Sequence, residues 1–70
     1  MRAEEAVRAA YIHACNKHPV FPKNPHAALS ILVEEVGEIA QALNEGDMAA
    51  ALLEAAQVGA VIQRFIEEFS

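Results

Sequence analysis

Residues 25–47, PHAALSILVEEVGEIAQALNEGD, decide the fold of this chain together with the apolar residues 48–69 that follow. Apolar side chains three and four apart indicate a helix from about Pro25 to Asn44, with one packing seam: Leu29, Leu32, Val36, Ile39 and Leu43. Gly46 is available for a left-handed C-terminal cap, and Asp47 for the N-cap of a third helix that ends near Phe69. A turn this short predicts that the two helices pack as an antiparallel hairpin.

A first helix is predicted upstream, from about Ala3 to Lys17, because small and apolar residues recur there at helical spacing. It must stop before Pro19, since the residue preceding a proline is disfavoured in the α conformation. Asn24 followed by Pro25 is a favourable start for the second helix.

The length of 70 residues predicts one domain, 1–70, and 54% of its residues are apolar. A chain this small cannot easily bury so many apolar side chains and often completes its core by oligomerising. We therefore expect an all-α fold, a helical hairpin plus an N-terminal helix. A homodimer or homotetramer would complete a four-helix-type bundle.

The net charge of −5 argues against a nucleic-acid polymer as partner, since such proteins usually carry a basic patch. Cys15 is the only cysteine, which excludes a disulfide framework and fits a reducing compartment. No apolar run is expected to reach the roughly 20 residues that span a bilayer. We expect a cytoplasmic protein without a membrane partner.

The glutamates of the second and third helices lie on different helix faces, and the face indicates the role of each. Glu34 lies on the polar side of the second helix, where solvation alone explains it. Glu35 borders the apolar arc one turn before Glu38, and both face a neighbouring helix. Glu54 stands in a helix apolar on nearly all sides, where an unpaired carboxylate is costly, and it shares a face with Gln57. Three carboxylates and an amide oxygen suit Mg²⁺ or Mn²⁺, whereas capping and ion pairing remain the ordinary alternative.

The stretch 32–43, LVEEVGEIAQAL, resembles the first signature of the MazG-like nucleotide pyrophosphohydrolases, an all-α superfamily. That signature has two adjacent glutamates and a third glutamate three residues later. A downstream Glu-x-x-Asp follows, here Glu54-Ala-Ala-Gln57, and fifteen residues separate Glu38 from Glu54.

The resemblance implies hydrolysis of nucleoside triphosphates to a monophosphate and pyrophosphate, with Mg²⁺ as cofactor and Mn²⁺ possible. It implies that Glu35, Glu38 and Glu54 are metal ligands, with Gln57 in the fourth position. Glu34 would bind a second metal or orient water, so that Glu34, Glu35, Glu38 and Glu54 form the catalytic set. Gln57 departs from the family pattern, because a carboxamide adds no charge and cannot act as a general base.

Three cations are candidates for binding the phosphates of the substrate: Arg64, Lys17 and Lys23. Arg64 shares a face with Gln57 about 10 Å further along the helix. Its alternative role is to favour the helix dipole and pair with Glu68. For Lys17 and Lys23 the alternative is ordinary exposed loop charge.

Two function classes therefore compete. One is the Mg²⁺-dependent pyrophosphohydrolase, and the other is a non-catalytic helical oligomer that binds nucleotide or acts as an interaction module. Glu54 separates them, since a pure scaffold gains nothing from an acid inside an apolar helix.

Overall fold

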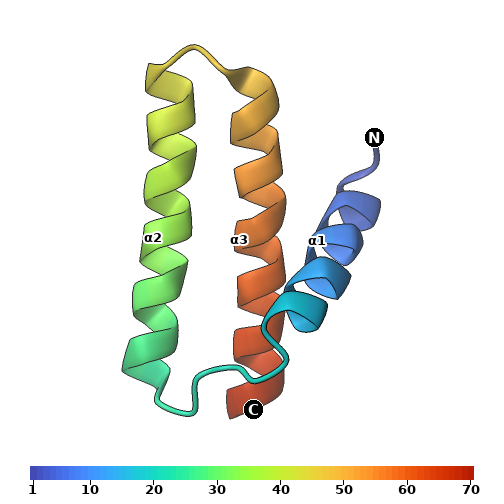
Figure 1. Cartoon of the computed structure of the whole chain (residues 1–70), viewed down its shortest axis with the longest axis vertical. Coiled ribbons are helices and arrows are strands. Elements are labelled where there is room, and N and C mark those ends of the chain that lie inside the picture. The colour runs from blue at the N-terminus through green and yellow to red at the C-terminus, as the bar shows by residue number, and fades with distance from the viewer.

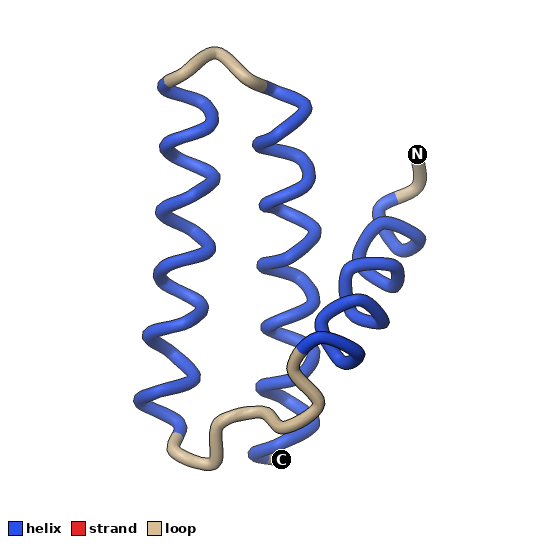
Figure 2. The backbone as a smooth tube through the Cα atoms, in the orientation of Figure 1, coloured by secondary structure: helices blue, strands red, loops and turns tan.

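The computed structural model describes all 70 residues and contains three helices and no strand. Helix α1 spans Ala3–Lys17, α2 spans Pro25–Asn44 and α3 spans Met48–Phe69 (Figure 1). Short loops connect them, as the backbone tube in Figure 2 shows. The predicted all-α class and the predicted helix boundaries are confirmed.

Local hydrogen bonds explain where the helices start and turn. The Asn24 side-chain oxygen accepts from the backbone N–H groups of His26 at 2.8 Å and Ala27 at 3.3 Å, which caps α2. The Asp47 carboxylate accepts from Ala50 N–H at 2.9 Å and caps α3. Between them Gly46 adopts a φ of 73°, a left-handed conformation that glycine reaches without steric cost.

Helix α3 lies in the middle of the molecule, with α2 packed along one side and α1 crossing the other (Figure 1). Helices α1 and α2 make no packing contact with each other. Gly59 permits the close approach of α1, because a Cβ at this position would lie 2.8 Å from Cγ2 of Val7. The three helices thus form one layer rather than a closed bundle.

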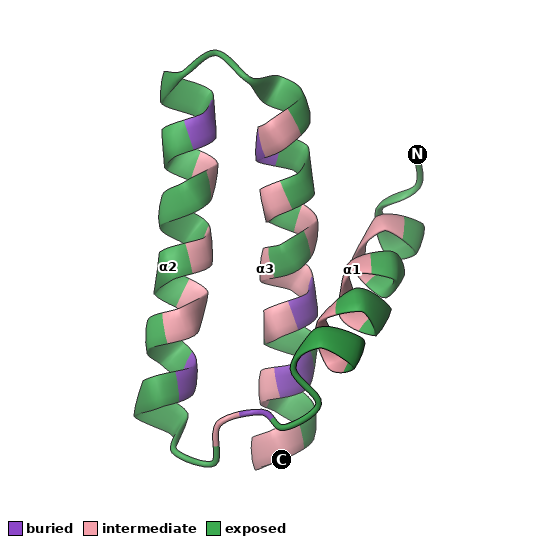
Figure 3. Ribbon diagram, in the orientation of Figure 1, coloured by how far each residue is buried: buried purple, intermediate pink, exposed green.

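The seam between α2 and α3 differs from the predicted one at three of its five α2 positions, each of which is shifted by one residue. The α2 residues turned toward α3 are buried or half-buried: Ala28, Leu32, Glu35, Ile39 and Ala42. Three predicted seam residues, Leu29, Val36 and Leu43, are instead about half exposed, and most of the α2 ribbon is exposed (Figure 3). The seam prediction was partly wrong because α2 is apolar over a wider arc than one neighbour covers.

The core of the single chain is thin. Its buried residues are four alanines, Phe21 and Arg64, and no large side chain is completely buried. Phe21, from the loop between α1 and α2, packs edge-to-face against Phe69, which in turn packs against Phe65. These aromatic contacts anchor the loop at the C-terminal end of α3.

The expectation about apolar runs is corrected by α3. This helix of 22 residues is long and apolar enough to cross a membrane by length and composition alone. The core helix of a soluble protein can have the same length and composition, although little of α3 is buried within the chain. The sequence did not show this apolar stretch plainly, because alanine, glycine and glutamine residues separate its larger apolar side chains.

Candidate metal centre

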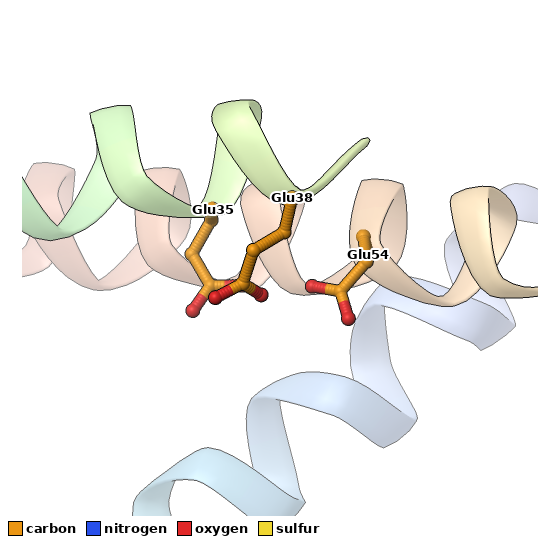
Figure 4. Close-up of side chains that lie close together, drawn as sticks. All are labelled: Glu35, Glu38 and Glu54. Carbon is orange, nitrogen blue, oxygen red and sulfur yellow. The ribbon is translucent and has the colours of Figure 1, made fainter. Parts of the chain in front are cut away.

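Three carboxylates from two helices meet at the middle of the hairpin. Glu35 and Glu38 are one turn apart on α2, and Glu54 projects from α3 toward them (Figure 4). One oxygen from each of the three lies within 4.8 Å of the others. The structure therefore confirms the predicted convergence of these three residues.

Two oxygens of this cluster are buried without a partner. Oε2 of Glu35 and Oε2 of Glu54 are inaccessible to solvent and accept no hydrogen bond. Ionised carboxylates can only accept hydrogen bonds, so the neighbouring glutamates cannot satisfy one another. An orphaned buried acceptor costs free energy, which a cation or a proton shared between the carboxylates would recover.

Burial is the main influence on the pKa of Glu35. Desolvation raises the pKa of the Glu35 carboxyl above its ordinary value, because burial disfavours the charged form. The negative charges of Glu38 and Glu34 raise this pKa further, while a proton on Glu54 that is donated to Glu35 would lower it. The site thus concentrates negative charge where solvent screens it incompletely.

Glu38 is exposed, and its pKa is raised mainly through Glu54. A protonated Glu38 can donate a hydrogen bond to the Glu54 carboxylate, which is the largest cause of the shift, and charge repulsion between the two adds to it. Because both effects disfavour two ionised carboxylates side by side, an added positive charge would stabilise Glu38 and Glu54 in their ionised forms.

The donor set fits a hard divalent cation. Mg²⁺ and Mn²⁺ prefer carboxylate oxygens, and Mg²⁺ is held by few protein ligands with water in its remaining positions. In an octahedral Mg²⁺ site, trans ligands lie about 4.2 Å apart and cis ligands about 3 Å apart. Oxygens that lie up to 4.8 Å apart would therefore need to draw closer around the cation, and Glu38 is free to move because it is exposed.

The other two residues predicted for the metal site, Glu34 and Gln57, lie outside this cluster of three glutamates. Glu34 is exposed on the solvent side of α2 and acts on the cluster through its charge on Glu35. Gln57 is exposed one turn after Glu54 on α3. Its helical position places it at the edge of the site where Glu38 also lies.

The expected pairing of Arg64 with Glu68 is wrong, whereas its expected role toward a phosphate stays a prediction. Its side chain is buried and donates to the carbonyl oxygens of His18 at 2.8 Å and Ala14 at 3.4 Å. The guanidinium also lies over the Phe21 ring, 5.1 Å from the centroid. Arg64 therefore caps the C-terminal end of α1 and makes no pair with Glu68. It lies ten residues beyond Glu54, about 15 Å along the helix.

The predicted phosphate-binding cations are not gathered around the acids. Lys23 is 3.0 Å from the carboxylate of Glu68 in an ion pair. Together with Arg64 it lines a shallow hollow of about 290 Å³ that contains none of the three clustered glutamates. Lys17 is exposed in the last turn of α1. Their roles toward a substrate stay predictions.

One contact beside that hollow was missed from the sequence. The Tyr11 hydroxyl donates to the Glu67 carboxylate, which joins α1 to α3. This hydrogen bond is the main reason that the pKa of Tyr11 is raised to about 12. The pair is 56 residues apart in the chain, and no local spacing could have revealed it.

The chain matches no model of a known protein family, and comparison with curated proteins and with solved structures finds no similar protein. The resemblance of residues 32–57 to the MazG-like signatures therefore stands on these residues alone.

Proposed function

We propose that the chain is a Mg²⁺-dependent nucleoside triphosphate pyrophosphohydrolase that converts a ribo- or deoxynucleoside triphosphate to a monophosphate and pyrophosphate. The observation that carries the proposal is the convergence of Glu35, Glu38 and Glu54 within 4.8 Å. The two orphaned buried oxygens in this cluster independently favour a bound cation. The sequence resemblance adds the reaction class.

Each residue has a distinct part in this proposal. Glu35 and Glu54 offer partly buried oxygens that would hold the cation, and exposed Glu38 would close the site from the solvent side. Bound Mg²⁺ would neutralise phosphate charge and make an attacking water more acidic. Glu34, close enough to act electrostatically on Glu35, would accept a hydrogen bond from that water and orient it.

The test is pyrophosphate release from a panel of nucleoside triphosphates in the presence of Mg²⁺. Glu38→Gln should lower the rate at least about tenfold, since even the outer partners of metal ligands contribute that much. Glu45→Gln is the matched control, because Glu45 is an exposed acid beyond the C-terminal end of the same helix. It should keep the parent rate. No release from any triphosphate by the parent chain would refute the proposal.

The second candidate is a non-catalytic helical oligomer. It is favoured by the exposed carboxamide of Gln57 in place of the family's carboxylate and by the apolar side chains that the single chain leaves exposed. Binding of Mn²⁺ without pyrophosphate release would select this candidate, whereas release that depends on Glu38 would exclude it.

A further inference from the structure

The candidate metal centre has three carboxylates and no fourth. Glu35, Glu38 and Glu54 each offer one oxygen to a common point, and these oxygens lie within 4.8 Å of one another (Figure 4). Glu34 lies outside this group, exposed on the solvent side of α2. The position one turn after Glu54 is occupied by the uncharged side chain of Gln57. The number of carboxylates therefore limits how much positive charge the chain can hold here.

The two orphaned oxygens define one position for a cation. Oε2 of Glu35 and Oε2 of Glu54 are buried without a hydrogen-bond partner, and they come from the two facing helices α2 and α3. A single cation between the helices would satisfy both oxygens. Two divalent cations in one site lie about 3.5–4 Å apart, and each requires oxygen ligands of its own. The oxygens of three carboxylates at one point suit one cation better than two.

The charge of the cluster favours the same number. One divalent cation leaves the three carboxylates with one net negative charge, whereas two cations leave one net positive charge. An uncompensated charge is costly where solvent is partly excluded. A second cation therefore needs another anionic ligand, and the carboxamide of Gln57 carries no charge.

A triphosphate that approaches this site meets no cluster of basic side chains. Lys23 forms an ion pair with Glu68 at 3.0 Å. Arg64 donates to backbone carbonyl oxygens and lies about 15 Å along α3 from Glu54. The cluster with one cation keeps a net negative charge, which repels a free triphosphate. Phosphate oxygens are themselves good ligands for Mg²⁺, so a triphosphate that has already bound Mg²⁺ avoids much of this repulsion.

We infer that the chain by itself holds one divalent cation, between Glu35 and Glu54, and that its substrate is a triphosphate–metal chelate that brings the second cation. This inference rests on the proposed function and names the form in which the nucleotide binds. The phosphate oxygens supply the anionic ligands that Gln57 does not. Exposed Glu38 lies at the edge of the cluster where the chelate enters.

Mn²⁺ is the probe for this inference, because electron paramagnetic resonance distinguishes an isolated ion from a pair about 3.5–4 Å apart. Titration of the parent chain with Mn²⁺ alone should give one bound ion per chain and the spectrum of an isolated ion. A nucleoside triphosphate with a methylene group between its α and β phosphorus atoms resists hydrolysis. Adding this analogue should double the number of bound ions and produce the spectrum of a spin-coupled pair.

Two glutamines on α3 provide matched variants. Gln57→Asp adds the missing carboxylate, so the chain should bind two Mn²⁺ ions without nucleotide. Gln63→Asp adds the same charge to the same helix, and Gln63 is also exposed. Nine residues at about 100° each place Gln63 on the face of α3 opposite to Glu54. This control variant should keep one ion per chain.

The outcomes separate this inference from the proposed reaction. Two Mn²⁺ ions on the parent chain without nucleotide, or an isolated ion after the analogue is added, would overturn the inference and leave the proposed hydrolysis standing. Equal ion counts in Gln57→Asp and Gln63→Asp would also overturn it. The expected counts without pyrophosphate release from any triphosphate would refute the reaction but support the inference about nucleotide binding. A chain that binds no Mn²⁺ at all would refute both.

Discussion

At the scale of single residues, the cluster of Glu35, Glu38 and Glu54 is the feature that structural stability does not explain. Two of its oxygens are buried without a hydrogen bond, and burial and neighbouring charges raise the pKa of Glu35. A chain selected for stability alone would place amides or apolar residues here. A bound cation would relieve the repulsion between these carboxylates.

Gln57→Asp tests whether position 57 belongs to the metal centre. Its helical position sets it one turn from Glu54 at the open edge of the site. An added carboxylate should tighten Mg²⁺ or Mn²⁺ binding severalfold, because the ligand charge increases. Isothermal titration calorimetry measures this directly. Unchanged affinity would place Gln57 outside the shell of ligands.

Tyr11 gives a readout of the contact between α1 and α3. The chain contains one tyrosine, so ultraviolet titration reports the pKa of Tyr11 without ambiguity. Its pKa of about 12 should fall toward 10 in Glu67→Ala, which removes the main cause of the shift. A raised pKa means that the protonated hydroxyl is favoured in the folded state. The stabilisation from this contact is thus complete below pH 10 and is lost as the pH rises through about 12. An unchanged pKa in Glu67→Ala would contradict the contact.

At the scale of the helices, α3 is the element on which the other two depend. It packs against α2 through one side and against α1 through another, and Arg64 ties the end of α1 to it through two carbonyl oxygens. Gly59 sets the distance to α1, while Gly37 on α2 has no neighbour within 4 Å of a would-be Cβ. The two helical glycines therefore respond differently to the same substitution.

Gly37→Ala should raise the free energy of unfolding by about 0.5–1 kcal/mol, because alanine lowers the entropy of the unfolded chain and fits the helix. Gly59→Ala should lower it by about 1 kcal/mol or more, since the added methyl group overlaps Val7. Urea denaturation measures both. Adding Val7→Ala to Gly59→Ala should remove part of the clash, and its failure to do so would point to another cause.

Arg64→Met should lower the free energy of unfolding by about 2 kcal/mol, because two carbonyl groups at the end of α1 lose their charged donor. Amide hydrogen exchange should become faster in α1 than in α2. Arg8→Met is the control, because Arg8 is exposed on α1, and its effect should stay within about 0.5 kcal/mol. Equal effects of the two variants would contradict the capping role.

At the scale of the whole molecule, the single chain is one layer of helices with a thin core. No large side chain is completely buried, and the stabilising contacts are spread over small seams on either side of α3. A ligand that binds only the folded chain adds to its stability. If the proposed metal binds, it should therefore raise the thermal stability of the chain.

Mg²⁺ or Mn²⁺ should raise the melting temperature, with a gain of about 2.7 kcal/mol at a metal concentration 100 times the dissociation constant. Glu54→Gln should abolish this gain. Without metal the same variant should be as stable as the parent or more stable, because the amide can donate to a neighbouring glutamate and removes one like charge. Glu45→Gln should respond to metal as the parent does. Equal metal gains in both variants would place the binding site elsewhere.

The sequence alone determined the elements and the three acids of the site. Asn24, Pro25, Gly46 and Asp47 mark helix ends through hydrogen bonds and backbone preferences that act within a few residues. The spacing of Glu35, Glu38 and Glu54 could be read as one cluster because a short turn leaves an antiparallel hairpin few alternatives.

Only the tertiary structure decided how those elements use their side chains. Arg64 caps α1 rather than pairing with Glu68, because a loop anchored by Phe21 brings the end of α1 to it. The seam of α2 is rotated from the predicted one for a similar reason. Helix α2 is apolar over more than one face, and helical spacing cannot tell which face a neighbour covers and which stays open.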